Sequence, residues 1–385
     1  MSKYVQIIDS GVVISRPDNV FGYSAWPSVA RDANGDLLVA FSGNRIMHVC
    51  PFGKVLIVKS KDEGKTWSAP MIAVDTPLDD RDAGILNVGD GRLVVTTFNN
   101  TRENQRKWAE GGKYGTEVLR NLALAYLPTL CDAQEEKYYG SLMSISEDNG
   151  FSWGEPFKVP VSAPHGPNLL KNGSLIYAGI PFPGKPAGSS YPIAVYRSDN
   201  YRDFYKLADI PVCPEAPDVL YVEPHIIELP NGRLVLHIRM DEVGKRYEEK
   251  LFTICQSISD DGGKTWTTPK IIGSTGAPPH LMLHSSGTLI CAYGRRTPGY
   301  GIQVMFSRDN AETWDTDYYI WDEGESADLG YPASVELDNG DIFTVFYAAK
   351  KGEKLPSSKD KKENPEMKTY SGMCSILWTR WRIPE

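Results

Sequence analysis

The sequence has few of the residues that build metal centres or disulfide frameworks. Its 385 residues include six cysteines, which stand singly, and no Cys-x-x-Cys pair occurs. Six histidines are scattered in the same way, without a His-Glu-x-x-His motif. We therefore expect no zinc site and no other cofactor, and we interpret the thiols as core residues.

Long apolar runs and an excess of positive charge are also missing. No apolar run approaches the roughly 20 residues that span a bilayer, and 41 basic against 49 acidic residues give a net charge of −8. Nucleic acids and anionic membranes bind concentrated positive charge, so we expect neither as a partner. The amino terminus lacks the apolar stretch of a secretory signal, which favours a cytoplasmic protein; a secreted chain already freed of its leader would look the same. Nothing in the sequence indicates an oligomeric state.

Aromatic residues and turn-forming residues are abundant. The chain has 20 Tyr, 9 Trp, 35 Gly and 27 Pro, with 41% apolar and 23% charged residues. The apolar and charged fractions are those of a folded chain and exclude a disordered one. The aromatic and turn residues favour β structure.

One hairpin pattern recurs six times: an apolar run, a turn that ends in glycine, and a second apolar run. Asn-Gly, Asp-Gly or Ser-Gly between two such runs is a strong hairpin signal, because glycine accepts the positive φ of a tight turn. The turn glycines are Gly35, Gly91, Gly173, Gly232, Gly287 and Gly340, at intervals of 56, 82, 59, 55 and 53 residues. Six similar hairpins predict six similar units, with one insertion of about 26 residues in the longest interval.

A second repeat, Ser-x-Asp-x-Gly-x-x-Trp, lies between the hairpins. It begins at Ser60, Ser146, Ser259 and Ser307, and the last copy has Ala311 in place of the glycine. A degenerate fifth copy begins at Ser198. Asp and Gly suit a tight turn between strands, and the tryptophan can pack between neighbouring sheets.

The two repeats together resemble the sialidase superfamily, in which Asp-box repeats decorate a six-bladed β-propeller. The resemblance covers about residues 20 to 380 and implies an all-β fold in a single domain over 1–385. Residues 4–15 are expected to complete the last blade beside the carboxy-terminal strand and so close the ring. The second blade is expected to carry a helical insertion at about 103–137, with one helical stretch before Pro128. The aspartates of the repeats, which such propellers place on outer turns, are interpreted as structural: Asp62, Asp148, Asp261 and Asp309.

Aligned hairpins predict which side chains meet at the propeller axis. The residues nine before each turn glycine are Trp26, Asp82, Pro164, Glu223, Pro278 and Tyr331. Seven before it stand Ser28, Gly84, Gly166, His225, His280 and Ala333, with His165 eight before in the third copy. The second strands return to the same end near Arg45, Arg102, Arg239, Arg295 and Arg296. Acid, phenol, imidazole and guanidinium groups around one opening predict a site for a small polar ligand, most simply an anion.

The resemblance assigns roles to three of these residues. The segment VEPHIIELPNGRLVLHIR is similar to the block with the catalytic glutamate and a carboxylate-binding arginine, which implies Glu223 and Arg239. GYPASVELDNG is similar to the block with the catalytic tyrosine, which implies Tyr331. A neutral phenol, deprotonated by an adjacent glutamate, avoids the repulsion that a carboxylate nucleophile would meet from a substrate carboxylate.

Two positions depart from the family pattern. Ala25 stands where sialidases have their first carboxylate-binding arginine, and the expected acid/base aspartate before the first Asp-box is missing. His48 is the proton donor we propose in its place. Arg295 or Arg296 is the candidate for the third arginine. We therefore expect ordinary sialosides to be poor substrates.

Three functions remain open from the sequence. The leading one is a sialidase-like exo-glycoside hydrolase that removes a terminal acidic sugar, with Tyr331 and Glu223 as nucleophile pair and His48 or Asp82 as acid/base. The second is a polysaccharide lyase acting on a uronate, and the third is a non-catalytic carbohydrate-binding propeller. The expected substrate-binding residues are Arg45, Arg239, Arg295, Arg296, Trp26, His165, His225 and His280.

Overall fold

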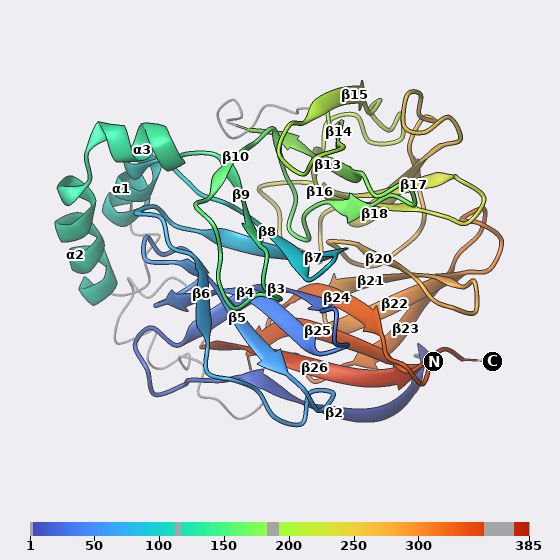
Figure 1. Cartoon of the computed structure of the whole chain (residues 1–385), viewed down its shortest axis with the longest axis horizontal. Helices are drawn as coiled ribbons and strands as arrows, with labels where there is room; N and C mark the ends of the chain where they lie inside the picture. The colour runs from blue at the N-terminus through green and yellow to red at the C-terminus, as the bar shows by residue number, and fades with distance from the viewer. Residues whose placement is uncertain (1–2, 112–116, 183–191, 350–372, 385) are drawn as a thin grey trace.

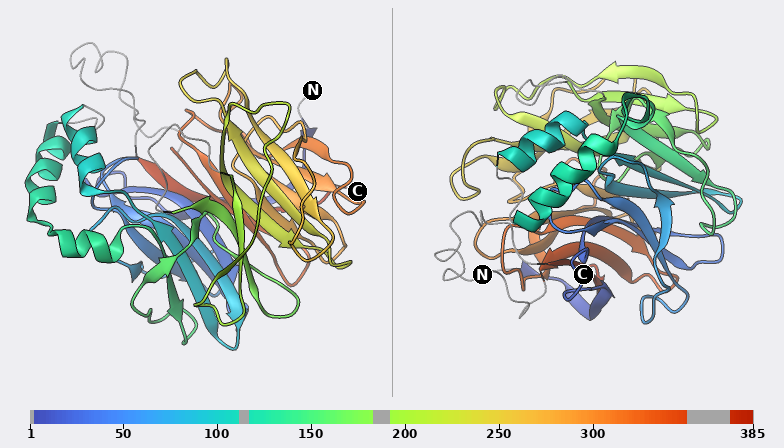
Figure 2. Two further views of the ribbon diagram at one scale, coloured as in Figure 1. Left: turned by 90° about the horizontal axis from the view of Figure 1, so that it is seen from above. Right: turned by 90° about the vertical axis from the view of Figure 1, so that its left-hand side faces the viewer.

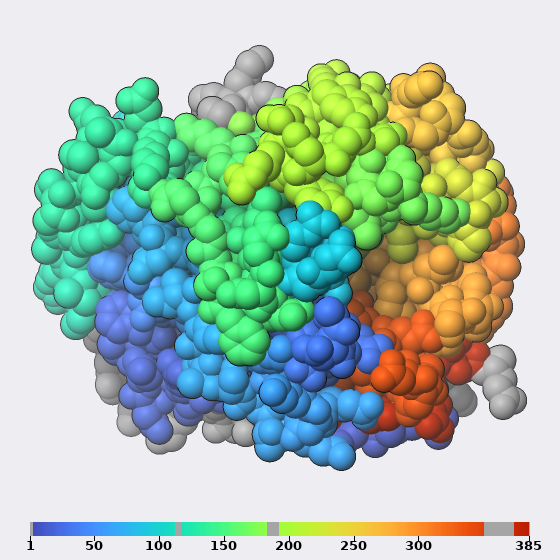
Figure 3. Space-filling model, viewed as in Figure 1, coloured from blue at the N-terminus to red at the C-terminus, as the bar shows by residue number. Residues whose placement is uncertain are grey.

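The computed structural model describes residues 3–111, 117–182, 192–349 and 373–384. These residues form six sheets, antiparallel except for one short parallel strand, arranged around a central axis (Figure 1). The space-filling view shows one face drawn inward near its middle, where cyan, yellow-green and orange segments converge (Figure 3). The predicted all-β, six-bladed propeller is confirmed.

Apart from two amino-terminal strands, the strands of each sheet follow the chain order from the inner strand outward. The first sheet contains β3 (Tyr23–Arg31), β4 (Leu37–Arg45), β5 (Lys54–Ser60) and β6 (Met71–Val74). The second contains β7 (Arg81–Gly89), β8 (Arg92–Phe98), β9 (Ser141–Ser146) and β10 (Phe157–Val159). The third contains β11 (Val161–Ser162), β12 (Asn168–Leu169), β13 (Leu175–Pro181), β14 (Ala194–Ser198) and β15 (Tyr205–Asp209). The fourth contains β16 (Leu220–Glu228), β17 (Leu234–Asp241), β18 (Phe252–Ser259) and β19 (Lys270–Ile271).

The last two sheets also hold the amino-terminal strands. The fifth contains β20 (His280–Leu283), β21 (Leu289–Arg295), β22 (Gly301–Ser307) and β23 (Asp315–Trp321), and β1 (Lys3–Tyr4) adds to it in parallel. The sixth contains β24 (Gly330–Glu336), β25 (Ile342–Ala349) and β26 (Cys374–Arg382), and β2 (Gln6–Ile14) completes it antiparallel to β26. The predicted closure by the amino-terminal strand is therefore confirmed, and it leaves the ring without an open seam.

The hairpin turns have the backbone that their glycines predict. All six turn glycines have φ between 74° and 87°, a region that glycine enters without a steric penalty. Because each turn is tight, it fixes which residue of the inner strand faces which residue of the second strand. Residues at the same position in the aligned hairpins therefore lie at the same level of their sheets.

The four Ser-x-Asp turns repeat one hydrogen-bond pattern. In the first, Asp62 Oδ1 accepts from Ser60 Oγ at 2.8 Å and from the Thr66 amide at 2.9 Å, and Oδ2 accepts from Thr66 Oγ1 at 2.7 Å. The other three turns repeat these bonds. The four tryptophans of the turns, Trp67, Trp153, Trp266 and Trp314, each pack against an apolar cluster between two neighbouring sheets. The turns thus stabilise the sheets and their packing.

The described part of the insertion in the second sheet contains three α-helices, where the sequence predicted one helical stretch. They are α1 (Arg102–Glu110), α2 (Glu117–Tyr126) and α3 (Asp132–Tyr138), with the 3₁₀ turn η1 (Leu127–Thr129) after α2. They stand together at one side of the sheets (Figure 2). Arg102 belongs to them and pairs with Glu135 at 2.5 Å, so its predicted place at the axial opening is wrong.

The helices cover the segment that carries His48. Met47, Val49 and Cys50 form one buried cluster with Ala109 of α1 and Leu119 of α2. The insertion therefore supports one wall of the propeller opening. No helix in the described ranges combines the length and hydrophobicity needed to cross a membrane.

Candidate active site

Four inner strands share an unusual backbone at the aligned position. Trp26, Asp82, Glu223 and Tyr331 have φ of 51°, 48°, 52° and 52°, and the pairing register of β3, β7, β16 and β24 shifts at each of them. A bulge with a left-handed residue re-aims one side chain at a cost of about 1–3 kcal/mol. The same strain in four sheets marks one ring of residues, which we call the axial ring.

Proline residues explain where the register breaks. Pro27, Pro224 and Pro332 follow three of the four ring residues. A proline inside a strand cannot donate to the ladder, so it favours a bulge. The two remaining hairpins have Pro164 and Pro278 at the aligned position, and the pyrrolidine ring of a proline keeps its φ negative. Those two sheets do not supply a left-handed residue at this position.

Tyr331 and Glu223 meet in the axial ring, as the alignment predicts. Tyr331 Oη donates to Glu223 Oε1 at 2.6 Å. Arg239 Nη1 donates to Glu223 Oε2 at 2.6 Å and lies 3.4 Å from Tyr331 Oη. Tyr331 is 5% exposed, while the Glu223 side chain is 20% exposed. A phenol, a carboxylate and a guanidinium from two sheets thus form one hydrogen-bonded unit.

Arg239 has a second acidic partner. Its Nη2 donates to Asp241, which also accepts from Lys250 Nζ at 2.5 Å. Burial raises the pKa of Asp241, but Arg239 and Lys250 outweigh burial and hold that pKa below its usual value. With two carboxylates bound, the guanidinium of Arg239 orients Glu223 and is less available to a substrate carboxylate than the sequence suggests.

The surroundings of Tyr331 keep its phenol protonated. Burial and the neighbouring charges of Glu223 and Asp82 raise its pKa well above the usual value, although Arg239 and Arg296 oppose the rise. Such a phenol becomes a nucleophile or a base only if a neighbouring group accepts its proton. Glu223 is placed to do so.

Asp82 is a carboxyl group without a hydrogen-bond donor among the described residues. Burial raises its pKa to about 7, Arg81 opposes the rise, and the charge of Glu223 adds to it. Asp82 is 6% exposed. An acid whose pKa lies near neutral pH can both donate and accept a proton during turnover.

His48 is held by groups that the sequence did not reveal. Its Nδ1 lies 3.0 Å from Asp328 Oδ1 and 3.1 Å from Tyr23 Oη, and its ring packs edge-on against Trp26 at 4.9 Å. Burial lowers the pKa of His48, with Asp328 opposing the shift. Asp328 stands three residues before Tyr331 on the same chain segment, which is the one signal that links it to the site.

The three remaining predicted arginines lie in different environments. Arg45 is fully buried and pairs with Asp79 at 2.5 Å, which argues against the predicted contact with a ligand. Arg295 Nη2 donates to the Pro298 carbonyl at 3.1 Å, and within the described ranges no hydrogen bond or ion pair joins it to a residue of the axial ring. Arg296 lies 5.6 Å from the Tyr331 ring and donates to Tyr247 Oη at 2.9 Å. Of the pair, only Arg296 belongs to the site.

His165, His225 and His280 form a stack next to the axial ring. The rings of His225 and His280 lie parallel at 4.6 Å, and His165 meets His280 edge-on at 4.9 Å. The Nδ1 atoms of His225 and His280 accept from backbone amides. Burial lowers the pKa of all three imidazoles well below the usual value. These contacts favour a structural role over the predicted role in substrate binding.

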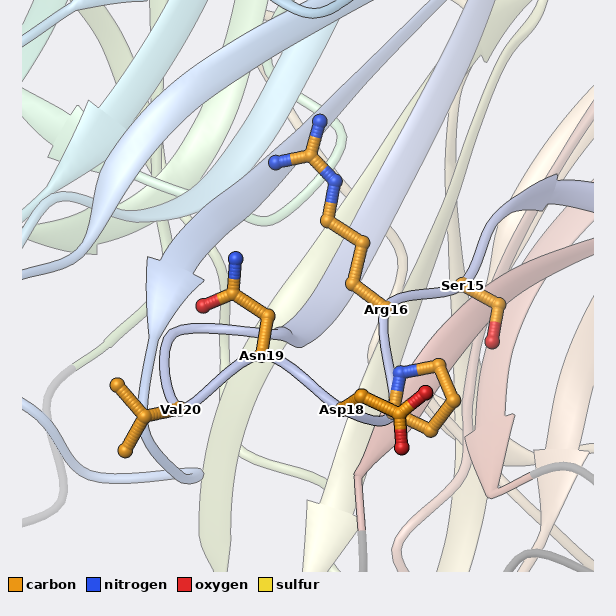
Figure 4. Close-up of a pocket in the computed structure, with 6 residues that line it drawn as sticks. Ser15, Arg16, Asp18, Asn19 and Val20 are labelled. Atoms are coloured by element: carbon orange, nitrogen blue, oxygen red, sulfur yellow. The ribbon is translucent and has the colours of Figure 1, made fainter.

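In the part of the chain that the structure describes, neither a metal cluster nor an open surface hollow competes with the axial ring as a ligand site. Among the described residues, no group of three or more His, Cys, Asp or Glu side chains is arranged to hold a metal ion. An open hollow of about 520 Å³ borders the loop between β2 and β3 (Figure 4), lined by Ser15, Arg16, Pro17, Asp18, Asn19 and Val20. None of the predicted site residues lines it, so the axial ring remains the candidate site.

The fold and the axial ring define a six-bladed propeller of the sialidase-like kind. Residues 121–344, more than half of the chain, match the family of the BNR repeat-like domain. The chain belongs to that family. No curated protein matches the sequence.

Solved structures share the whole fold at low sequence identity. A protein of unknown function from Dyadobacter fermentans DSM 18053 gives a TM-score of 0.74 at 21% identity, with 99% of each chain covered. The intramolecular trans-sialidase from Ruminococcus gnavus gives 0.61 at 14% identity, with 98% of each chain covered. The alpha-L-arabinofuranosidase of Fusarium graminearum gives 0.61 at 13% identity, with 97% of this chain and 98% of the other covered. The similarity extends over the complete propeller.

Proposed function

We propose that the protein is a sialidase-like exo-glycoside hydrolase that removes one terminal sugar from a glycan or oligosaccharide. The observation that carries the proposal is the 2.6 Å hydrogen bond from Tyr331 Oη to Glu223 Oε1, made by two strained residues of the axial ring. Similar structures bear the names of a trans-sialidase and an arabinofuranosidase, which supports a carbohydrate as the substrate class.

In the first step, Tyr331 Oη attacks the anomeric carbon while Glu223 takes the phenolic proton. The bond from the anomeric carbon to the leaving oxygen breaks, and Asp82 in its acid form gives that oxygen a proton. Arg239 bridges Glu223 and Tyr331, so its charge stabilises the negative charge that passes between them.

In the second step, a water molecule replaces the tyrosine. Asp82 accepts a proton from the water, the new oxygen bonds to the anomeric carbon, and the bond to Tyr331 breaks. Glu223 returns the proton to the phenolate. We assign the acid/base role to Asp82 because its pKa is raised to about 7, and His48 is the second candidate.

A panel of aryl glycosides and uronides tests the proposal. Wild-type protein should release the aryl chromophore from at least one substrate, and Tyr331→Phe should abolish the release. Tyr177→Phe is the matched control, because Tyr177 is a buried tyrosine of the third sheet whose Oη accepts from the Ala163 amide at 3.2 Å. New absorbance from a double bond, without release of the chromophore, would identify a lyase instead. Binding without either signal would identify a non-catalytic propeller.

A further inference from the structure

Arg81 is a charged residue of the site for which the described residues provide no acidic partner. It begins β7, directly before Asp82, and is partly exposed. None of the described carboxylates forms an ion pair with it, and its Nε is buried without a hydrogen-bond partner. A guanidinium has five N–H donors, and leaving them unpaired near a buried site is unfavourable unless a ligand or water accepts them.

The position of Arg81 is fixed by aromatic rings. Its guanidinium carbon lies 4.4 Å from the centre of the Trp26 ring and 5.9 Å from that of Phe98. Stacking on Trp26 orients the guanidinium without using any of its hydrogen-bond donors. The donors of Arg81 therefore stay available while the side chain is held in place.

The charge of Arg81 acts on the groups of the site. Burial has the largest effect on the pKa of His48 and lowers it, Asp328 raises it, and the positive charge of Arg81 lowers it further. Arg81 also lowers the pKa of Asp82, which burial raises. Arg81 is therefore near both candidate acid/base residues. A substrate group bound to Arg81 would lie beside the reacting atoms.

The other arginines predicted near the opening already have partners. Arg45 is paired with Asp79, and Arg239 is paired with Glu223 and Asp241. Arg296 is 6% exposed and is held by neutral oxygens, among them Tyr247 Oη at 2.9 Å and the Leu329 carbonyl at 3.1 Å. Arg81 combines an unpaired charge with access from solvent.

We propose that Arg81 binds the carboxylate of an acidic sugar and so determines the substrate class of the site. This inference rests on the proposed function. The planar fork of a guanidinium accepts a carboxylate through two parallel hydrogen bonds, whereas a lysine offers only a point charge. A neutral sugar would leave the charge of Arg81 unpaired and would bind more weakly.

Calorimetric titration with free sugar acids tests the proposal without turnover. D-glucuronate, D-galacturonate and N-acetylneuraminate would each be compared with the corresponding neutral methyl ester, on wild-type protein and on Arg81→Gln and Arg81→Lys. Wild-type protein should bind at least one acid at least tenfold more tightly than its ester. Arg81→Gln should lose that preference, and Arg81→Lys should keep part of it. Arg197→Gln, which removes an arginine paired with Asp199 in the third sheet, should leave the preference unchanged.

The outcomes separate this inference from the proposed function. Equal binding of acid and ester by wild-type protein, no binding of any acid, or an equal loss of both in folded Arg81→Gln would overturn the role of Arg81. A melting curve for each variant shows whether it is folded, and Arg81→Lys keeps the test valid if Arg81→Gln is not. Acid binding that depends on Arg81, in a protein without turnover, would support the inference and contradict the hydrolase.

Discussion

Asp62 and Asp82 are 20 positions apart in the chain, yet their carboxyl groups have opposite surroundings. Asp62 closes the turn after β5, and hydrogen bonds from Thr66 and Ser60 lower its pKa to about 2. Asp82 is the second residue of the inner strand β7 and has φ of 48°, and burial raises its pKa to about 7. Both aspartates belong to features that repeat around the propeller. The partners of a repeated residue, and not its repetition, indicate whether it stabilises the fold or is available for chemistry.

Exchanging each carboxyl group for an amide gives the largest expected contrast. Asp82→Asn should lower kcat by about 10²–10⁴-fold, because it removes the proposed acid/base group, and should leave the melting temperature unchanged or higher. Asp62→Asn should leave kcat unchanged and lower the melting temperature, because the amide cannot accept all the bonds of the turn. Steady-state kinetics and thermal melts on both variants measure the contrast. Full turnover in Asp82→Asn would exclude Asp82 as the acid/base group.

Asp79 adds a third case to the comparison of Asp62 with Asp82, because it is fully buried and forms an ion pair with Arg45. Asp79→Ala leaves Arg45 as a buried charge without its partner, and the free energy of unfolding should fall by about 3–5 kcal/mol. The control is Glu110→Ala, which removes the exposed partner of Arg106 in α1 and should cost at most about 0.5 kcal/mol. Urea denaturation measures both. A small effect of Asp79→Ala would mean that Arg45 is not held as the structure indicates.

The pH dependence of kcat/KM tests the role of Asp82. The acid form of a group with a pKa of about 7 is lost as the pH rises above 7. The rate should therefore fall about tenfold per pH unit on the alkaline side. Asp62→Asn should leave this limb where it is, since that group stays ionised throughout the range. If the rate instead began to fall at a pH below the usual histidine pKa, and if His48→Asn abolished this fall, the acid/base role would belong to His48.

The histidine stack gives the smallest expected effect. Because the pKa of His225 is lowered in the folded chain, the unfolded chain binds more protons below about pH 6.5. Stability should therefore fall as the pH falls from 6.5, by up to about 1.4 kcal/mol per pH unit for this group. His225→Gln should flatten the slope between pH 6.5 and 5 in urea titrations. Asp82 has the opposite sign, because its raised pKa makes stability fall as the pH rises from about 4 to 7.

The fold and the axial ring could be predicted from the sequence because tight turns fix the register. Counting back from Gly232 and Gly340 leads to Glu223 and Tyr331, which are hydrogen-bonded in the structure. The position of Arg239 follows in the same way, since β17 pairs directly with β16. Wherever a contact depends on one hairpin or on two aligned hairpins, the sequence is informative.

Contacts between loops could not be predicted. Asp328 lies 280 positions from His48, and Asp79 lies 34 positions from Arg45, with no repeat to relate them. Consecutive residues point to opposite sides of a strand, so Arg295 and Arg296 could not be distinguished without the geometry at the end of β21. The alignment of hairpins placed the three histidines near the axis, but it could not show that His165 and His225 are buried.

The central claim is that Tyr331 and Glu223 act as one catalytic unit, and a double-mutant cycle on kcat tests it most directly. Tyr331→Phe and Glu223→Gln should each remove most of the turnover of the best substrate in the panel. Residues that act together lose activity non-additively, so the double variant should be within about threefold of the worse single variant. Glu336→Gln, in the sixth sheet, is the matched control and should keep full turnover. Losses that multiply in the double variant, or full activity in either single variant, would contradict the account.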